Sequence, residues 1–173
     1  MPRKPAKTAA KVPAKPPRRP AMTTATSTPI LSSGDVRAIL HDLTATVAPG
    51  DVEDLLELEV GLRGRAAKLE PHFAPLGLQV EFALDLLRHH IEGECPQVPY
   101  STVALLLAGL CYFADEMDVI PDFLPGVGRL DDAAVMQMAC EMAADGIRRY
   151  CTANGRSAEG LFSAAPEARR QKK

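Results

Sequence analysis

A continuous apolar run is the feature that most constrains how this chain of 173 residues can fold. Residues 103–114 contain only Ala, Val, Leu, Gly, Cys, Tyr and Phe, so a helix formed by them has no polar face. Such a helix is either surrounded by other helices or placed in a membrane. The run has 12 residues, whereas a helix that crosses a bilayer needs about 20. We therefore expect a buried core helix, with a membrane-embedded or re-entrant segment as the alternative.

Four other segments repeat apolar residues with the period of an amphipathic helix. They span residues 36–47, 52–69, 80–91 and 132–150, and the apolar run extends to a helix over 101–114. Ser33 or Asp35 is the expected N-cap of the first helix. No segment alternates polar and apolar residues as a strand does, so the sequence predicts an all-α fold of about five helices.

Proline and charge are distributed unevenly along the chain. Residues 1–29 hold seven prolines, seven basic residues and no acidic residue, a net charge of +7. Residues 30–165 carry −12 and residues 166–173 carry +3. A segment so rich in Pro and Lys buries too little apolar surface to offset its ordering entropy. We therefore expect a disordered basic tail over 1–29, a helical domain over 30–165 and a basic tail over 166–173.

The four cysteines indicate a reducing environment. Cys95, Cys111, Cys140 and Cys151 form no C-x-x-C pair, and the N-terminal residues lack the apolar stretch of a secretory signal. Cys111 and Cys140 lie in apolar runs, which is typical of core thiols. The expected localisation is therefore cytoplasmic, with membrane association left open by the apolar run.

A loop rich in Pro, Gly and Asp lies between the apolar run and the last predicted helix. Pro121 and Pro125 each fix φ and remove a backbone donor, so no regular helix crosses the loop. Asp131 and Asp132 directly precede an apolar helical pattern, where carboxylates cap a helix and favour its positive end. This favours a rigid, capped interhelical loop. Its apolar side chains, expected to fill the gap between the helices, are Ile120, Phe123, Leu124 and Val127.

The same loop also permits a divalent-cation site. Six carboxylates fall within 18 residues: Asp115, Glu116, Asp118, Asp122, Asp131 and Asp132. Ca²⁺ and Mg²⁺ bind through several oxygen ligands, although the EF-hand spacing is absent. His89 or His90 is a candidate nitrogen ligand, but adjacent helical residues point about 100° apart, so at most one faces any site. No other cofactor is indicated.

The loop and its flanks resemble the signature of the YkvA-like family, domain of unknown function 1232. That signature has a Tyr, a Pro-x-Asp, an Ile-Pro-Asp-Phe, a Pro-x-x-Gly and an Asp-Asp pair in this order. The matching residues are Tyr112, Asp118, Ile120, Pro121, Asp122, Phe123, Pro125, Gly128, Asp131 and Asp132. Glu116 stands where the family usually has a proline, which changes that turn and adds a carboxylate. The resemblance covers about 103–138 and implies a helix–loop–helix hairpin, often membrane-associated, with no settled activity.

The sequence assigns no catalytic residue, because it contains no G-x-S-x-G motif, glycine-rich phosphate loop or zinc-ligand spacing. We expect a non-enzymatic module that binds a protein partner or a membrane surface. The alternative is a divalent-metal-dependent enzyme or metal sensor that uses the acidic loop 115–132. The basic tails are typical of weak, salt-sensitive contacts with anionic lipid or nucleic acid, and the acidic domain opposes strong binding to nucleic acid.

Overall fold

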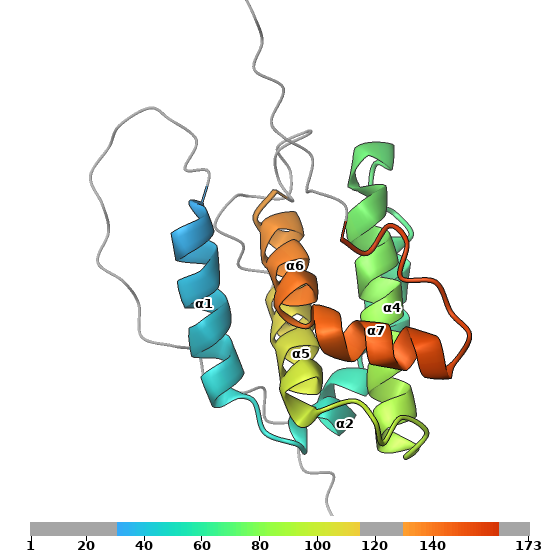
Figure 1. Ribbon diagram of the computed structural model, residues 1–173. Helices are drawn as coiled ribbons and strands as arrows, with labels where there is room; N and C mark the ends of the chain where they lie inside the picture. The colour runs from blue at the N-terminus through green and yellow to red at the C-terminus, as the bar shows by residue number, and fades with distance from the viewer. Residues whose placement is uncertain (1–30, 115–129, 163–173) are drawn as a thin grey trace, which may run out of the picture.

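The computed structural model describes residues 31–114 and 130–162, which form a bundle of helices (Figure 1). Its elements are α1 (Ser33–Thr46), α2 (Asp51–Leu56), α3 (Glu59–Ala66), the 3₁₀ turn η1 (Pro71–Phe73), α4 (Ala74–Ile91), α5 (Tyr100–Ala114), α6 (Leu130–Met142) and α7 (Ala144–Ala153). Neither described range contains a strand, so the all-α prediction is confirmed. The predicted tails over 1–29 and 166–173 lie outside the described residues.

Two of the predicted helices are each divided in two. The segment predicted as one helix over 52–69 forms α2 and α3, and the segment over 132–150 forms α6 and α7. Leu58 (φ −90°, ψ −1°) and Ala143 (φ −85°, ψ 1°) stand at the breaks. Their conformation lies at the edge of the helical region, so one helix ends and the next begins within two residues at 57–58 and within one residue at Ala143. Apolar spacing does not reveal such a break, because the stripe continues across it.

The first helix is capped one residue earlier than we predicted. Ser32, rather than Ser33 or Asp35, is the N-cap of α1, and its hydroxyl accepts the backbone N–H of Asp35 at 3.2 Å. Asp35 in turn accepts the backbone N–H of Ser32 at 3.2 Å. This reciprocal capping box assigns Asp35 to the third helical position instead of the cap.

α5 is the central helix of the bundle. It runs antiparallel to α4 and α6, and it also contacts α1 (Figure 1). Its buried residues are Thr102, Val103, Ala104, Leu106, Leu107, Ala108, Gly109, Leu110 and Phe113. A Cβ at Gly109 would lie 2.9 Å from the sulfur of Met136, so the glycine permits the close approach of α5 and α6. The prediction of a buried core helix is therefore confirmed for the apolar run.

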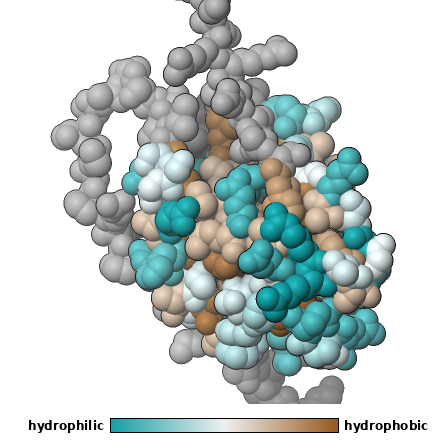
Figure 2. Space-filling view, viewed as in Figure 1, coloured by the Kyte–Doolittle hydropathy of each residue, from teal (hydrophilic) through white to brown (hydrophobic). Residues whose placement is uncertain are grey.

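The core has a larger and a smaller part. The larger part includes side chains from α2 to α7. The smaller part packs α1 against α5 and α6. Its members are Val36, Leu40, Ala108, Val135 and Ala139. Hydrophilic residues gather over the α7 side of the described surface (Figure 2). The bundle thus buries α5 on several sides and leaves α7 with a polar outer face.

Candidate functional site

Two predicted site residues lie at the start of α6, where α6 follows α5 in a helical hairpin. Asp131 and Asp132 lie in its first turn and are buried, with 2% and 1% of their surfaces exposed. Asp131 accepts the backbone N–H of Asp132 at 3.1 Å and the hydroxyl of Tyr112 at 3.3 Å. The positive end of the helix favours both carboxylates. Tyr112 and Asp131, which are 19 residues apart, therefore tie the end of α5 to the start of α6.

Most of the predicted loop lies outside the described residues. This holds for the carboxylates of Asp115, Glu116, Asp118 and Asp122, and for Ile120, Pro121, Phe123, Pro125 and Gly128. The rigid-loop interpretation and the divalent-cation hypothesis for this loop therefore both stay predictions. The structure brings together the remaining members, Tyr112, Asp131 and Asp132.

A second polar cluster, which sequence reasoning missed, lies along α4. Its members are Glu59 and Arg63 from α3, Glu81, Asp85 and Arg88 from α4, Tyr150 from α7, and Arg156. Asp85 accepts from Arg63 at 2.7 Å and from Arg156 at 2.8 Å, so one carboxylate joins two segments that are far apart in the sequence. Arg63 also pairs with Glu59 and Glu81. The network therefore holds α3, through Arg63, and the segment after α7, through Arg156, against α4.

The charge of Asp85 depends on this network. Burial alone would raise the pKa of its carboxyl group, but the hydrogen bonds from Arg63 and Arg156 outweigh burial and hold this pKa below its usual value. The folded state therefore favours the ionised form. The resulting stability is fully present above the ordinary pKa of an aspartate and is lost as the pH falls through the lowered value.

The last turn of α4 carries the two histidines that the sequence singled out. Nδ1 of His89 lies 2.8 Å from the hydroxyl of Tyr150, whereas the ring of His90 lies beside that of Tyr100. α4 ends at the opposite end of the bundle from the start of α6 (Figure 1). Neither histidine therefore lies beside Asp131 and Asp132, and the hypothesis that one of them joins those carboxylates is wrong.

Comparison with known families identifies the hairpin. A family model described as "Protein of unknown function (DUF1232)" matches residues 102–137, which run from the first turn of α5 into α6. The chain carries a YkvA-like segment. The resemblance expected from the loop residues is thereby confirmed.

A relative supports the same assignment over a longer stretch. The chain is 32% identical over 65 residues to "Uncharacterized membrane protein YkvA" of Bacillus subtilis (strain 168), which covers 38% of this chain and 61% of that protein. The chain therefore spans about three fifths of the length of this relative. No solved structure matches. Among the described residues, no helix has both the length and the apolar character that a membrane span requires.

A buried amide pair joins the end of the YkvA-like segment to the rest of the bundle. Gln79 of α4 donates to the side-chain carbonyl of Gln137 at 2.7 Å and to the backbone carbonyl of Leu161 at 2.8 Å. Gln137 donates in turn to Glu141 at 2.8 Å. Buried amides stay in a core only when they are hydrogen-bonded, so this chain of contacts fixes how α6 sits on α4. No pattern in the sequence indicated it.

Three of the four thiols are buried, and that of Cys111 is partly buried against the core. All four cysteines are free, and burial raises the pKa of Cys111 to about 11 and of Cys140 to about 12. The thiolate is the reactive form, so these two side chains stay protonated and unreactive at neutral pH. This agrees with the interpretation of Cys111, in the YkvA-like segment, and Cys140, just after it, as packing residues.

Proposed function

We propose that this protein is a non-enzymatic helical module that attaches to the surface of an anionic membrane through its basic N-terminal residues. Its relative in Bacillus subtilis carries the name of a membrane protein, which supports membrane association. The observation that carries the proposal is the burial of α5, which decides how the attachment is made.

The apolar run is already occupied by protein contacts. Leu106, Leu107 and Leu110 are fully buried, and α5 packs against α1, α4 and α6. Burying one Leu side chain is worth about 1.5–3 kcal/mol. Moving α5 into a bilayer would keep its own side chains in an apolar medium but would uncover the faces of the three helices around it. Insertion of α5 is therefore the costlier way to reach a membrane.

Charge provides the cheaper way. Residues 1–29 carry +7, and each Lys or Arg near an anionic membrane contributes about 1 kcal/mol. Residues 30–165 carry −12 and are repelled by the same surface. The opposite signs orient the molecule, with the N-terminal residues at the lipid and the helical body held away from it. The body is then free to meet a protein partner.

The test is flotation of the full chain with vesicles of neutral or partly anionic lipid at low and high salt. Attachment through residues 1–29 predicts binding to anionic vesicles only. This binding should be lost at high salt, because the screening length falls from about 10 Å at 0.1 M salt to about 3 Å at 1 M. Changing the seven basic residues of 1–29 to Gln is expected to abolish flotation. The matched control changes the four basic residues of 166–173 to Gln and is expected to retain most of it.

Two outcomes contradict the proposal. Binding that survives both high salt and the N-terminal change would implicate the YkvA-like hairpin instead. An absence of flotation in every condition would leave a protein partner as the target of the module.

A further inference from the structure

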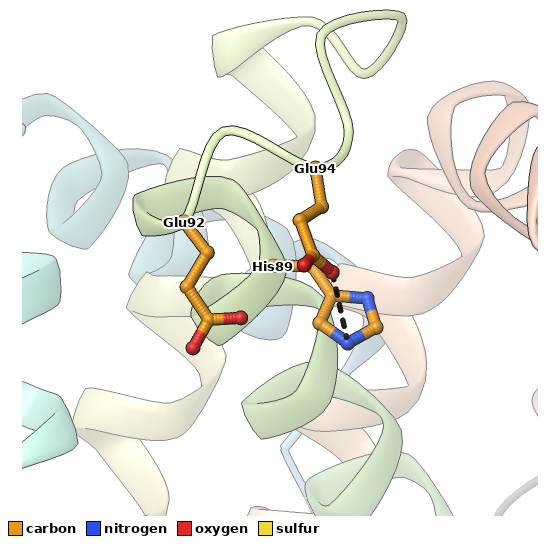
Figure 3. A group of neighbouring side chains, drawn as sticks. All are labelled: His89, Glu92 and Glu94. Atoms are coloured by element: carbon orange, nitrogen blue, oxygen red, sulfur yellow. Dashed lines mark ion pairs between the residues drawn. The ribbon is translucent and has the colours of Figure 1, made fainter.

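A mixed nitrogen and oxygen donor group lies at the C-terminal end of α4, outside the YkvA-like segment. His89, Glu92 and Glu94 each place one ligand atom within 4.8 Å of the others. Figure 3 shows the imidazole of His89 facing the carboxylate of Glu94, with Glu92 beside them at the same helix end. Nε2 of His89 is 3.8 Å from the nearer oxygen of Glu94.

The backbone builds this group from a short local sequence. Gly93 follows the end of α4 with φ of +75°, a conformation that suits glycine. The chain reverses there, so that the N–H of Glu94 bonds to the carbonyl of His89 at 2.8 Å and the N–H of Gly93 bonds to the carbonyl of His90 at 3.1 Å. This pair of bonds is the Schellman ending of a helix. It returns Glu94 to the turn that carries His89.

A buried tyrosine orients the histidine. Nδ1 of His89 is 2.8 Å from the hydroxyl of Tyr150, which also accepts from Arg156 at 3.2 Å. The Tyr150 ring is fully buried and packs edge-on against Phe82. Histidines that bind metals usually donate their other N–H to such an outer partner. Because the hydroxyl can accept from Nδ1–H, Nε2 is left unprotonated with a lone pair that can bind an ion.

The local electrostatics favour a cation. The end of a helix carries partial negative charge, and Glu92 and Glu94 add two carboxylates. Arg88, which precedes His89 in the sequence, pairs with Glu59, and Arg156, which contacts the Tyr150 hydroxyl, pairs with Asp85. A divalent ion between His89, Glu92 and Glu94 therefore meets net negative charge.

We propose that His89, Glu92 and Glu94 form a binding site for a divalent transition metal of the Zn²⁺ type, with water completing the coordination. Imidazole nitrogen with carboxylate oxygen suits Zn²⁺, whereas Ca²⁺ and Mg²⁺ prefer oxygen alone. Zn²⁺ lies about 2.0–2.2 Å from such ligands, which sets two tetrahedral ligands about 3.4 Å apart. Nε2 of His89 and the Glu94 oxygen are 3.8 Å apart, and both glutamates are exposed, so their side chains have room to turn toward an ion bound at the Nε2 edge of the ring.

The test is isothermal titration of the full chain with Zn²⁺ under reducing conditions, repeated for single variants. His89→Gln and Glu94→Gln are expected to weaken binding at least tenfold. Tyr150→Phe keeps the ring and removes only the hydroxyl, and the loss of an outer partner typically weakens a metal site by about 10–100-fold. His90→Gln, the matched control on the adjacent position, is expected to bind as the unchanged chain does.

Three results would overturn the proposal. The first is an absence of Zn²⁺ binding by the unchanged chain. The second is equal binding by His89→Gln, which would place the ion at the cysteines or at another site. The third is an equal loss in His90→Gln, which would show a general effect on the helix. Circular dichroism of each variant checks that it is folded, and Glu94, which is exposed, can be changed without opening the core.

Discussion

The polar cluster at the α5–α6 end of the bundle and the polar network along α4 are assembled in different ways. At the α5–α6 end, Asp131 and Asp132 are adjacent in sequence, and the YkvA-like signature marks them. Along α4, Asp85 meets Arg63 and Arg156, which lie 22 and 71 residues away. The cluster at the α5–α6 end can be recognised from a short motif, because Asp131 and Asp132 are adjacent in the sequence. The network along α4 exists only once α3, α4 and α7 have packed, so a motif search does not find it.

The largest effect on stability is expected where α7 packs against α5. The same helix α7 carries Tyr150, which contacts His89. A Cβ at Gly146 would lie 1.9 Å from the hydroxyl oxygen of Thr102. Gly146→Ala should therefore lower the free energy of unfolding by about 3 kcal/mol through overpacking. The measurement is urea denaturation followed by circular dichroism.

Gly61→Ala is the matched control for this change. Gly61 also lies in a helix, but a Cβ there meets nothing within 4 Å. It should stabilise the protein by about 0.5–1 kcal/mol, since alanine favours a helix interior over glycine. Equal stability of the two alanine variants would show that α7 does not approach α5 through Gly146. The contacts of α7 with α4, including that of Tyr150 with His89, would then lose their basis in tertiary packing.

The next effect concerns the charge of Asp85. Asp85→Asn should cost about 2 kcal/mol at pH 7, because it removes hydrogen bonds between charged groups. The unchanged chain should lose this contribution as the pH falls below about 4, since the pKa of Asp85 is lowered in the folded state. The variant and the unchanged chain should therefore differ in stability at pH 7 and converge only once the pH has fallen through the lowered pKa of Asp85.

Asp145→Asn provides the comparison for Asp85. Asp145 pairs with Arg148 at 3.3 Å, but 93% of its side chain is exposed, so its loss should be close to neutral. If Asp85→Asn behaves like Asp145→Asn at pH 7, the network along α4 is a surface feature without structural weight.

These cases show which parts of the structure were accessible from sequence. The all-α class and the burial of the apolar run followed from apolar spacing. The YkvA-like segment followed from the resemblance of the loop residues, Asp131 and Asp132 among them, to the signature of that family. The breaks at Leu58 and Ala143 did not follow from the sequence, because an apolar stripe continues across such a break. The Gln79–Gln137 pair did not either, because glutamines 58 residues apart carry no local pattern.

The Schellman turn at the end of α4 lies between these extremes. Gly93 after a helical pattern is a local stop signal, and it predicts that the chain turns back there. The sequence thus contained the information that brings Glu94 onto His89. It did not contain the partner of His89, because Tyr150 is 61 residues away.

A smaller effect is expected at the α5–α6 end. Asp131→Ala removes a carboxylate that favours the N-terminus of α6 and accepts from Tyr112, at a cost of about 1 kcal/mol. Thermal denaturation measures it, and Tyr112→Phe, which removes only the hydroxyl, should cost less.

The same variant tests the divalent-cation hypothesis for the acidic loop. Calorimetry with Ca²⁺, Mg²⁺ and Mn²⁺ should show binding that Asp131→Ala weakens and His89→Gln leaves unchanged, if the loop 115–132 holds an ion. Silence for all three ions would end that hypothesis without affecting a Zn²⁺ site on α4.

The smallest effect on stability is expected from deletion of residues 1–29. The core of the described residues runs from Val36 to Leu161, and a segment rich in Pro and Lys adds little to such a core. The free energy of unfolding should therefore change by no more than about 0.5 kcal/mol, as it does for an ordinary surface substitution, and the melting temperature should be nearly unchanged. Flotation with anionic vesicles should nevertheless be lost, because the deletion removes a charge of +7. A large drop in melting temperature would instead show that the basic segment docks on the acidic helical body. That docking would remove the same charges from the membrane surface, and it should weaken at high salt, so the melting temperature of the unchanged chain would then fall as salt is added.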